Sequence, residues 1–182
     1  MDRPDIPFVE FPKIARYNRG IVITEKIDGT NAQVYVNDTG DRAYAGSRSR
    51  WITPEDDNHG FARWVRQNHD ELLRLGPGSH FGEWWGAGIQ RRYGLTEKRF
   101  SLFNTARWTA ESPPPACCHV VPVLHHGLIT KVDVLQVLDN LRTGGSVAAP
   151  GFMNPEGIVV YHVPSRNLYK MTLDKNDEHK GV

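Results

Sequence analysis

Residues 21–36, IVITEKIDGTNAQVYV, decide how the fold begins. Two runs of alternating, β-branched residues flank a polar segment, which predicts strands at 21–25 and 31–36 joined through a turn at Gly29. Lys26 stands where the first strand ends. An ammonium group at that point needs either an ion-pair partner, for which Asp28 is the nearest choice, or a chemical role as a nucleophile.

The remaining pattern predicts an α+β fold built on antiparallel β-sheets with flanking helices. A turn at 37–41 is followed by a returning strand at 42–47, and apolar residues at helical spacing predict a helix over 60–74. The loops expected are 86–97 and the proline-rich segment 111–118. Further strands are expected at 79–85, 99–104, 120–124, 157–162 and 167–173, and a second helix is expected to open with a capping box at Thr130–Asp133 and to close at 144–145.

Composition limits the class of protein. The chain has 182 residues, 39% hydrophobic and 24% charged, which suits a single domain over 1–182 with its own core. The formal net charge of +1 gives no strong attraction of the whole molecule to nucleic acid, so any such binding must come from a local patch. We find no signal-peptide or membrane-spanning pattern, and the adjacent Cys117 and Cys118 make no disulfide framework, so we expect a cytoplasmic protein without membrane contact.

Charged residues at the ends of several predicted strands form a candidate site. The segment GSRSR at 46–50 offers two guanidinium groups, FGEWWG at 81–86 carries Glu83 between glycines, Glu156 opens the strand at 157–162, and Lys170 lies in the last strand. Cations and carboxylates in this combination suit a polyphosphate and a divalent metal.

Several of these charged residues, and two phenylalanines of the strand at 99–104, also have an ordinary structural interpretation. Arg48 and Arg50 fit the charged end of a hairpin, Glu83 fits a strand cap or a partner for Arg91, and Phe100 and Phe103 fit a hydrophobic core.

In this order the segments resemble the motifs of the ATP-dependent RNA ligase family, within the covalent nucleotidyltransferases that include DNA ligases and mRNA-capping enzymes. EKIDGTN is similar to motif I, FGEWWG to motif III, KRFSLFN to motif IIIa, PEGIVVY to motif IV and LYKMTL to motif V. Thr30 and Asn31 after the motif I glycine resemble RNA ligases, because DNA ligases and capping enzymes usually carry an arginine soon after that glycine. The resemblance covers the chain from about residue 8 to its end.

The resemblance implies an ATP-grasp-like, ligase-type nucleotidyltransferase domain and a reaction in three steps. Lys26 attacks the α-phosphorus of ATP to form lysyl–AMP, the AMP moves to a 5′-phosphate end, and a 3′-hydroxyl then displaces it. Further roles implied by the family are Arg48 at ribose or phosphate, Glu83 at the ribose hydroxyls, Phe100 or Phe103 stacked on adenine, Glu25 and Ile27 beside the base, Glu156 holding Mg²⁺ or Mn²⁺ through water, and Lys170 at the α-phosphate.

Two departures from the family pattern bear on the later steps. Motif V usually carries two lysines separated by one residue, whereas Thr172 stands at the second position here. The chain also ends shortly after motif V, so we expect the adenylylation domain alone, without an OB-fold or other C-terminal domain. The residues present therefore predict self-adenylylation more directly than strand joining. For strand joining, a partner protein would supply the binding of the RNA ends.

A cationic segment, GIQRRYGLTEKRF, is the candidate contact with nucleic acid, through Arg91, Arg92, Lys98 and Arg99, with Tyr93 as stacking surface. Its ordinary alternative is a solvated loop. The acceptor expected is RNA with 5′-phosphate and 3′-hydroxyl ends. Two alternatives stay open: a ligase or nucleotidyltransferase acting on DNA or another acceptor, and a non-enzymatic module that binds a nucleotide or RNA ends.

Overall fold

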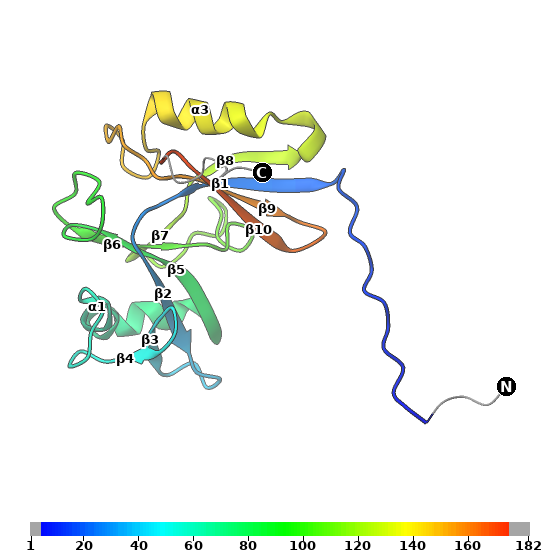
Figure 1. Cartoon of the computed structure of the whole chain (residues 1–182). Helices are drawn as coiled ribbons and strands as arrows, with labels where there is room; N and C mark the ends of the chain where they lie inside the picture. Colours follow the sequence, from blue (N-terminus) through cyan, green and yellow to red (C-terminus); the bar gives the residue numbers. More distant parts are fainter. Residues whose placement is uncertain (1–4, 175–182) are drawn as a thin grey trace.

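The structure is a computed structural model that describes residues 5–174. Two β-sheets make up the body, and each has helical elements packed on one face (Figure 1). The four-stranded sheet has the order β10-β9-β1-β8, formed by Asn167–Thr172, Gly157–His162, Gly20–Lys26 and Val123–Leu128. The six-stranded sheet has the order β4-β3-β2-β5-β6-β7, formed by Trp51–Ile52, Ala43–Ser47, Thr30–Val36, Gly78–Gly86, Lys98–Leu102 and Cys118–Val120.

All neighbouring strands are antiparallel except β6 and β7, which are parallel. The predicted α+β class with antiparallel sheet is therefore confirmed. The chain passes between the sheets at two places, from β1 to β2 through residues 27–29 and from β7 to β8 through residues 121–122. The first passage places the predicted nucleophile at the junction of the two sheets.

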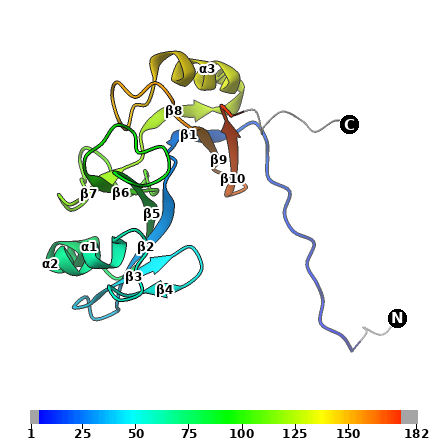
Figure 2. The same cartoon turned by 60° about the vertical axis from the view of Figure 1, so that its left-hand side comes forward.

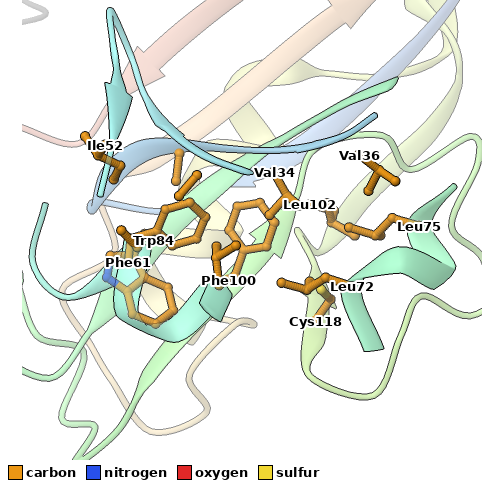
Figure 3. Packing of buried hydrophobic residues seen from close by; sticks show 14 of the residues in the cluster. Val34, Val36, Ile52, Phe61, Leu72, Leu75, Trp84, Phe100, Leu102 and Cys118 are labelled. Carbon is orange, nitrogen blue, oxygen red and sulfur yellow. The ribbon is translucent and has the colours of Figure 1, made fainter. Parts of the chain in front are cut away.

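Alternation along the strands explains where the cores form. In β2, Ala32, Val34 and Val36 face the core of the six-stranded sheet, while the residues between them face the opposite side. Figure 3 shows this core, in which α1 (Phe61–Gln67) packs its aromatic residue Phe61 against β5 and β6. The helix α3 (Val134–Gly144) covers the other sheet, and its Leu138 and Leu141 pack on the apolar side chains of β1 and β9.

Three predicted elements differ from the structure for local reasons. The helix predicted over 60–74 is divided into α1, α2 (His69–Leu72) and a 3₁₀ turn (Leu73–Leu75), because the Asn68 side chain donates to the Trp64 carbonyl at 2.8 Å and ends α1. The strand predicted over 120–124 is two strands in different sheets, separated at Pro122, which has no N–H for a ladder.

The third difference concerns the start of α3. Residues Ile129–Lys131 form a 3₁₀ turn, and the cap is Asp133, whose carboxylate accepts from the backbone N–H groups of Leu135 and Gln136. The helix therefore begins three residues later than the predicted capping box. The segment 111–118 is a loop as predicted except at its end, where Cys118 starts β7 and is buried in the core.

Residues 5–16 extend away from the body as a separate arm (Figure 2), whereas the backbone of Tyr17 and Arg19 is hydrogen-bonded to His162 and Ile129 of the body. Among the described residues, no helix has the length and apolar character required to cross a bilayer. Cys117 and Cys118 are free thiols.

Candidate active site

Lys26 ends β1 beside the strand that carries motif IV. Its Nζ donates to Glu156 Oε1 at 2.6 Å, so the partner of this lysine is Glu156 and not Asp28. The register places Lys26, Gly157 and Thr172 in one row across β1, β9 and β10. A Cβ atom on Gly157 would lie 2.1 Å from the Met171 carbonyl oxygen, so only glycine allows β9 and β10 to approach here.

Glu156 has capacity for a further ligand. Its side chain is mostly buried, and its second oxygen, Oε2, is buried without a hydrogen-bond partner among the described residues. A buried carboxylate oxygen in this state is costly unless it has a partner. A divalent cation shared between one carboxylate and the phosphates of a bound nucleotide fits this donor, because Mg²⁺ is often held by few protein ligands. The described residues contain no group of three or more His, Cys, Asp or Glu side chains that could hold a metal ion by themselves.

Glu83 fixes the turn that follows Lys26. Its carboxylate accepts from the Gly29 backbone N–H and from Asn31 Nδ2, both at 3.1 Å. A Cβ atom on Gly29 would lie 2.5 Å from the Trp84 carbonyl oxygen, so the close approach of the two segments requires glycine. The alternative pairing of Glu83 with Arg91 does not occur, because β5 points the carboxylate at the motif I turn instead.

The environment of Glu83 changes its titration. Burial raises the pKa of Glu83 from 4.5 to about 7, against the opposing effects of the Lys26 ammonium and of the hydrogen bonds from Gly29 and Asn31. The carboxyl group is therefore close to half protonated at neutral pH while no ligand covers it.

Arg91 joins three parts of the site. Its Nε donates to Asp28 Oδ2 at 2.9 Å, its Nη1 reaches the carbonyl oxygens of Asn154 and Pro155 at 3.3 Å, and its Nη2 pairs with Asp174 at 2.5 Å. The side chain is only 14% exposed. We call this set of contacts the Arg91 clamp. The predicted nucleic-acid contact by Arg91 is contradicted, because its donors are already used to hold motif I, the start of motif IV and the end of motif V together.

Glu25 is a structural residue rather than a neighbour of the base. The side chain is 1% exposed, and its carboxylate accepts from Ser146 Oγ at 2.6 Å and from the backbone N–H groups of Val147 and Ala148 at 2.8 and 2.9 Å. β1 thus turns Glu25 away from the face that carries Lys26. Ile27 is also buried, in a small core around Trp85, so its side chain has no free face for adenine either.

The structure separates the two phenylalanines of motif IIIa. Phe100 is fully buried against Phe61 and Trp64, which contradicts its predicted stacking on adenine. Phe103 is 42% exposed and lies beside Phe81 on the sheet face that also carries Glu83. Phe103 is therefore the remaining candidate for a stacking contact.

The other predicted cations have mixed outcomes. Lys170 is exposed on the same face of its sheet as Lys26, and Arg48 is exposed at the β3–β4 turn without a side-chain partner in the described part of the chain. Arg92 is exposed. Lys98 donates to the His59 carbonyl at 2.6 Å, and Arg99 pairs with Glu97 at 2.6 Å with its guanidinium over Trp85. The predicted cationic segment is thus largely engaged within the protein.

Two residues of the site were missed by sequence reasoning. Asn31 was singled out only as a family marker, although its position opposite Glu83 in the β2–β5 register is what orients that carboxylate. Tyr93 was expected as stacking surface for nucleic acid, but its side chain is buried and its hydroxyl accepts from the Asp28 backbone N–H at 2.7 Å, a role that no signal in the glycine-rich loop indicated.

Comparison with known proteins shows the family and the fold of the chain. The family model for RNA ligase matches residues 19–173, so the chain belongs to the RNA ligase family. Among solved structures, a Naegleria gruberi RNA ligase mutant with ATP and Mn has a TM-score of 0.61 at 19% identity, covering 85% of this chain and 49% of that one. The same ligase with PPi has a TM-score of 0.58 at 20% identity, covering 85% and 50%.

These structural matches confirm the expected ligase-type nucleotidyltransferase fold. The chain spans about half the length of the solved ligases that it matches. A comparison with curated proteins gave no match.

Proposed function

We propose that this chain is an ATP-dependent RNA ligase that forms a covalent lysyl–AMP on Lys26. The observation that carries the proposal is the meeting of Lys26, Glu156 and Glu83 where the two sheets join, with Lys170 on the same face. Family membership supports the activity, and the structures of the Naegleria gruberi enzyme with ATP and Mn support the cofactors.

In the first step the Lys26 amine attacks the α-phosphorus of ATP. A nitrogen–phosphorus bond forms, the bond to the leaving pyrophosphate breaks, and the ammonium proton must leave before attack. Glu156 accepts a hydrogen bond from Lys26 and so aligns Nζ and offers a carboxylate beside that proton. Lys170, exposed on the same face, would contact the developing charge on the phosphoryl oxygens.

A divalent Mg²⁺ or Mn²⁺ would be held through Glu156 Oε2, and it would neutralise charge on the phosphates. Glu83 keeps the motif I turn in place and, once a nucleotide is bound, is available to the ribose hydroxyls. Arg48 and Phe103 are the candidates for phosphate or ribose contact and for stacking on adenine.

In the later steps the AMP moves to a 5′-phosphate end of RNA, and a 3′-hydroxyl attacks that end and releases AMP. The 5′-phosphate and 3′-hydroxyl chemistry and the RNA acceptor are inferred from the family. We also propose that a partner protein contributes further binding of the RNA ends. The proposed location is the cytoplasm, where the free thiols of Cys117 and Cys118 stay reduced.

The test uses ATP labelled at the α-phosphate with magnesium or manganese, followed by denaturation and detection of label on the protein. Lys26→Arg is the informative variant, because it keeps a cation beside Glu156 but cannot act as a nucleophile at neutral pH. The exposed Lys131, changed to Arg, is the matched control. Label on wild type and on the control, but none on Lys26→Arg, is expected. Absence of label on wild type would refute the ligase proposal.

Addition of acceptors after adenylylation then ranks the substrates. Nicked duplex RNA, single-stranded RNA and nicked DNA, each with a 5′-phosphate and a 3′-hydroxyl, are compared for loss of the protein label and for joined product. Preference for DNA would replace the RNA acceptor by the DNA-end alternative, while the first step would stand.

A further inference from the structure

An unbroken row of residues crosses the six-stranded sheet next to Glu83. The register aligns Phe81 with Gln33, Gln33 with Gly46, and Gly46 with Trp51, and Phe103 donates its N–H to the Phe81 carbonyl at the other end. Residues directly opposite each other in neighbouring strands project from the same face. This row therefore places three aromatic side chains on the face of the sheet that faces away from the core.

A second row adds two more rings. Tyr35 is aligned with Tyr44, two residues further along their strands, and its ring centroid lies 6.3 Å from that of Tyr44 and 5.8 Å from that of Trp51. We call Phe81, Trp51, Tyr35 and Tyr44 the aromatic platform, and we keep Phe103 apart because it is the candidate for the stacking contact with adenine.

Three of the four platform residues are exposed to solvent, and Tyr35 is half-buried. Trp51 is 58% exposed, Phe81 56% and Tyr44 44%, whereas Val34 on the opposite face of the same strands is fully buried. Large aromatic side chains gathered on one exposed face mark an interaction surface. The Trp51 ring lies over Gly46, where a Cβ atom would come within 3.3 Å of it, so a glycine lets the indole lie close to the sheet.

The platform is continuous with the candidate active site. Glu83 and Asn31 form the next row on the same face, two residues from Phe81 and Gln33 and therefore about 7 Å away. A surface depression beside Trp51 is lined by residues 47–50. Within it Arg48 has no partner in the described part of the chain, while Arg50 pairs with Asp56. A guanidinium without a partner in the described residues, next to exposed aromatic rings, matches a negatively charged backbone that carries planar bases.

We propose that the aromatic platform binds unpaired nucleotides of the RNA whose end receives AMP from Lys26, by stacking bases on Trp51, Phe81 and Tyr44. Duplex RNA is the poorer occupant, because its bases are already stacked on one another and present only edges to a protein. This proposal rests on the proposed ligase function. It adds that the RNA is single-stranded next to the end that reacts. Because every base has a flat face, this contact selects unpaired structure rather than sequence.

Binding measurements without ATP test the proposal separately from ligation. Fluorescence anisotropy gives the Kd for a short, labelled, 5′-phosphorylated single-stranded RNA and for a fully paired nicked duplex, at one fixed salt concentration. Trp51→Ala and Phe81→Ala remove one ring each, and Trp51→Phe keeps a ring at the same position. Tyr169→Ala is the matched control, because Tyr169 is also 56% exposed but lies in the other sheet.

Each alanine variant of the platform is expected to weaken single-stranded binding about fivefold or more, with Trp51→Phe close to wild type. Binding of the nicked duplex should change less than twofold, and Tyr169→Ala should change neither. Self-adenylylation of the variants should stay at the wild-type level, which shows an intact fold and keeps the failure of this proposal distinct from failure of the ligase activity.

Unchanged single-stranded binding in both alanine variants would overturn the proposal. An equal loss for the nicked duplex, or the same loss in Tyr169→Ala, would also overturn it, because either result would show that the rings do not recognise unpaired bases.

Discussion

The raised pKa of Glu83 predicts a specific change of stability with pH. The group has a pKa of 4.5 in an exposed setting and about 7 in the folded protein, so the folded state binds this proton more tightly than the unfolded chain does. Its contribution to the free energy of unfolding is fully present below pH 4.5 and is lost as the pH rises through 7. At 1.36 kcal/mol for each pH unit between the two pKa values, the loss amounts to about 3 kcal/mol.

Glu83→Gln removes the titrating group while it retains an oxygen that can accept from Gly29 or Asn31. The free energy of unfolding of wild type and variant should be measured by urea denaturation at a series of pH values from 4 to 8. Because the other titrating groups are common to both proteins, the difference between the two curves isolates Glu83. We expect wild type to lose about 3 kcal/mol relative to Glu83→Gln across this range.

A second variant tests how the charge of Lys26 contributes to the pKa of Glu83. The Lys26 ammonium lowers the pKa of Glu83, so Lys26→Met should move the fall in stability to higher pH. A difference between wild type and Glu83→Gln that stays flat with pH, or that rises, would refute the conclusion that burial dominates at this carboxylate.

Three further substitutions test the rest of the site. Arg91→Lys keeps the charge but loses the forked contacts of the Arg91 clamp, so we expect a loss of about 1–3 kcal/mol in urea denaturation together with slower self-adenylylation, and unchanged values would refute the clamp. Glu25→Ala leaves a serine hydroxyl and two backbone N–H groups without their acceptor, so we expect a loss of about 3–5 kcal/mol by the same measurement, and a loss below about 1 kcal/mol would contradict its structural role. Thr172→Lys puts a second cation in the row of Lys26, so single-turnover adenylylation should become faster; a slower or unchanged rate would show that this position does not reach the phosphate.

Much of the fold could be predicted because local chemistry determines it. The alternation around residues 21–36 gave β1 and β2, and Gly144 and Gly145 marked the end of α3. The elements that were misplaced depend on single side chains whose choice of partner is not visible in a pattern. Asn68 ends α1 by bonding to the backbone one turn earlier, and Asp133 rather than Thr130 caps α3.

The candidate site, like the fold, could be predicted from the sequence only in part. Motif order brought Lys26, Glu83, Glu156 and Lys170 into one scheme, and the structure gathers them at the junction of the sheets or on the adjoining face. Pairing between charged residues distant in sequence could not be predicted, because Coulomb attraction alone does not tell which carboxylate a guanidinium will reach. Arg91 therefore looked like part of a nucleic-acid patch, although burial and acceptors on four residues make it a clamp.

Burial shows that Phe103, and not Phe100, is available for a ligand contact in motif IIIa. Burial also excludes Glu25 from the ligand contacts. Both questions depend on which face of a strand meets a helix or a loop, and that information is tertiary. The aromatic platform escaped notice for the same reason, since its rings come from four different strands and become neighbours only in the sheet.

The most direct measurement of the central claim is the position of the AMP on the protein. After incubation with ATP and magnesium or manganese, the protein is digested under mildly alkaline conditions, which preserve a phosphoramidate, and its peptides are analysed by mass spectrometry. The account predicts an adenylyl group on Lys26, and none on any peptide of Lys26→Arg. An adenylyl group on another residue, or wild-type protein that carries none, would contradict it.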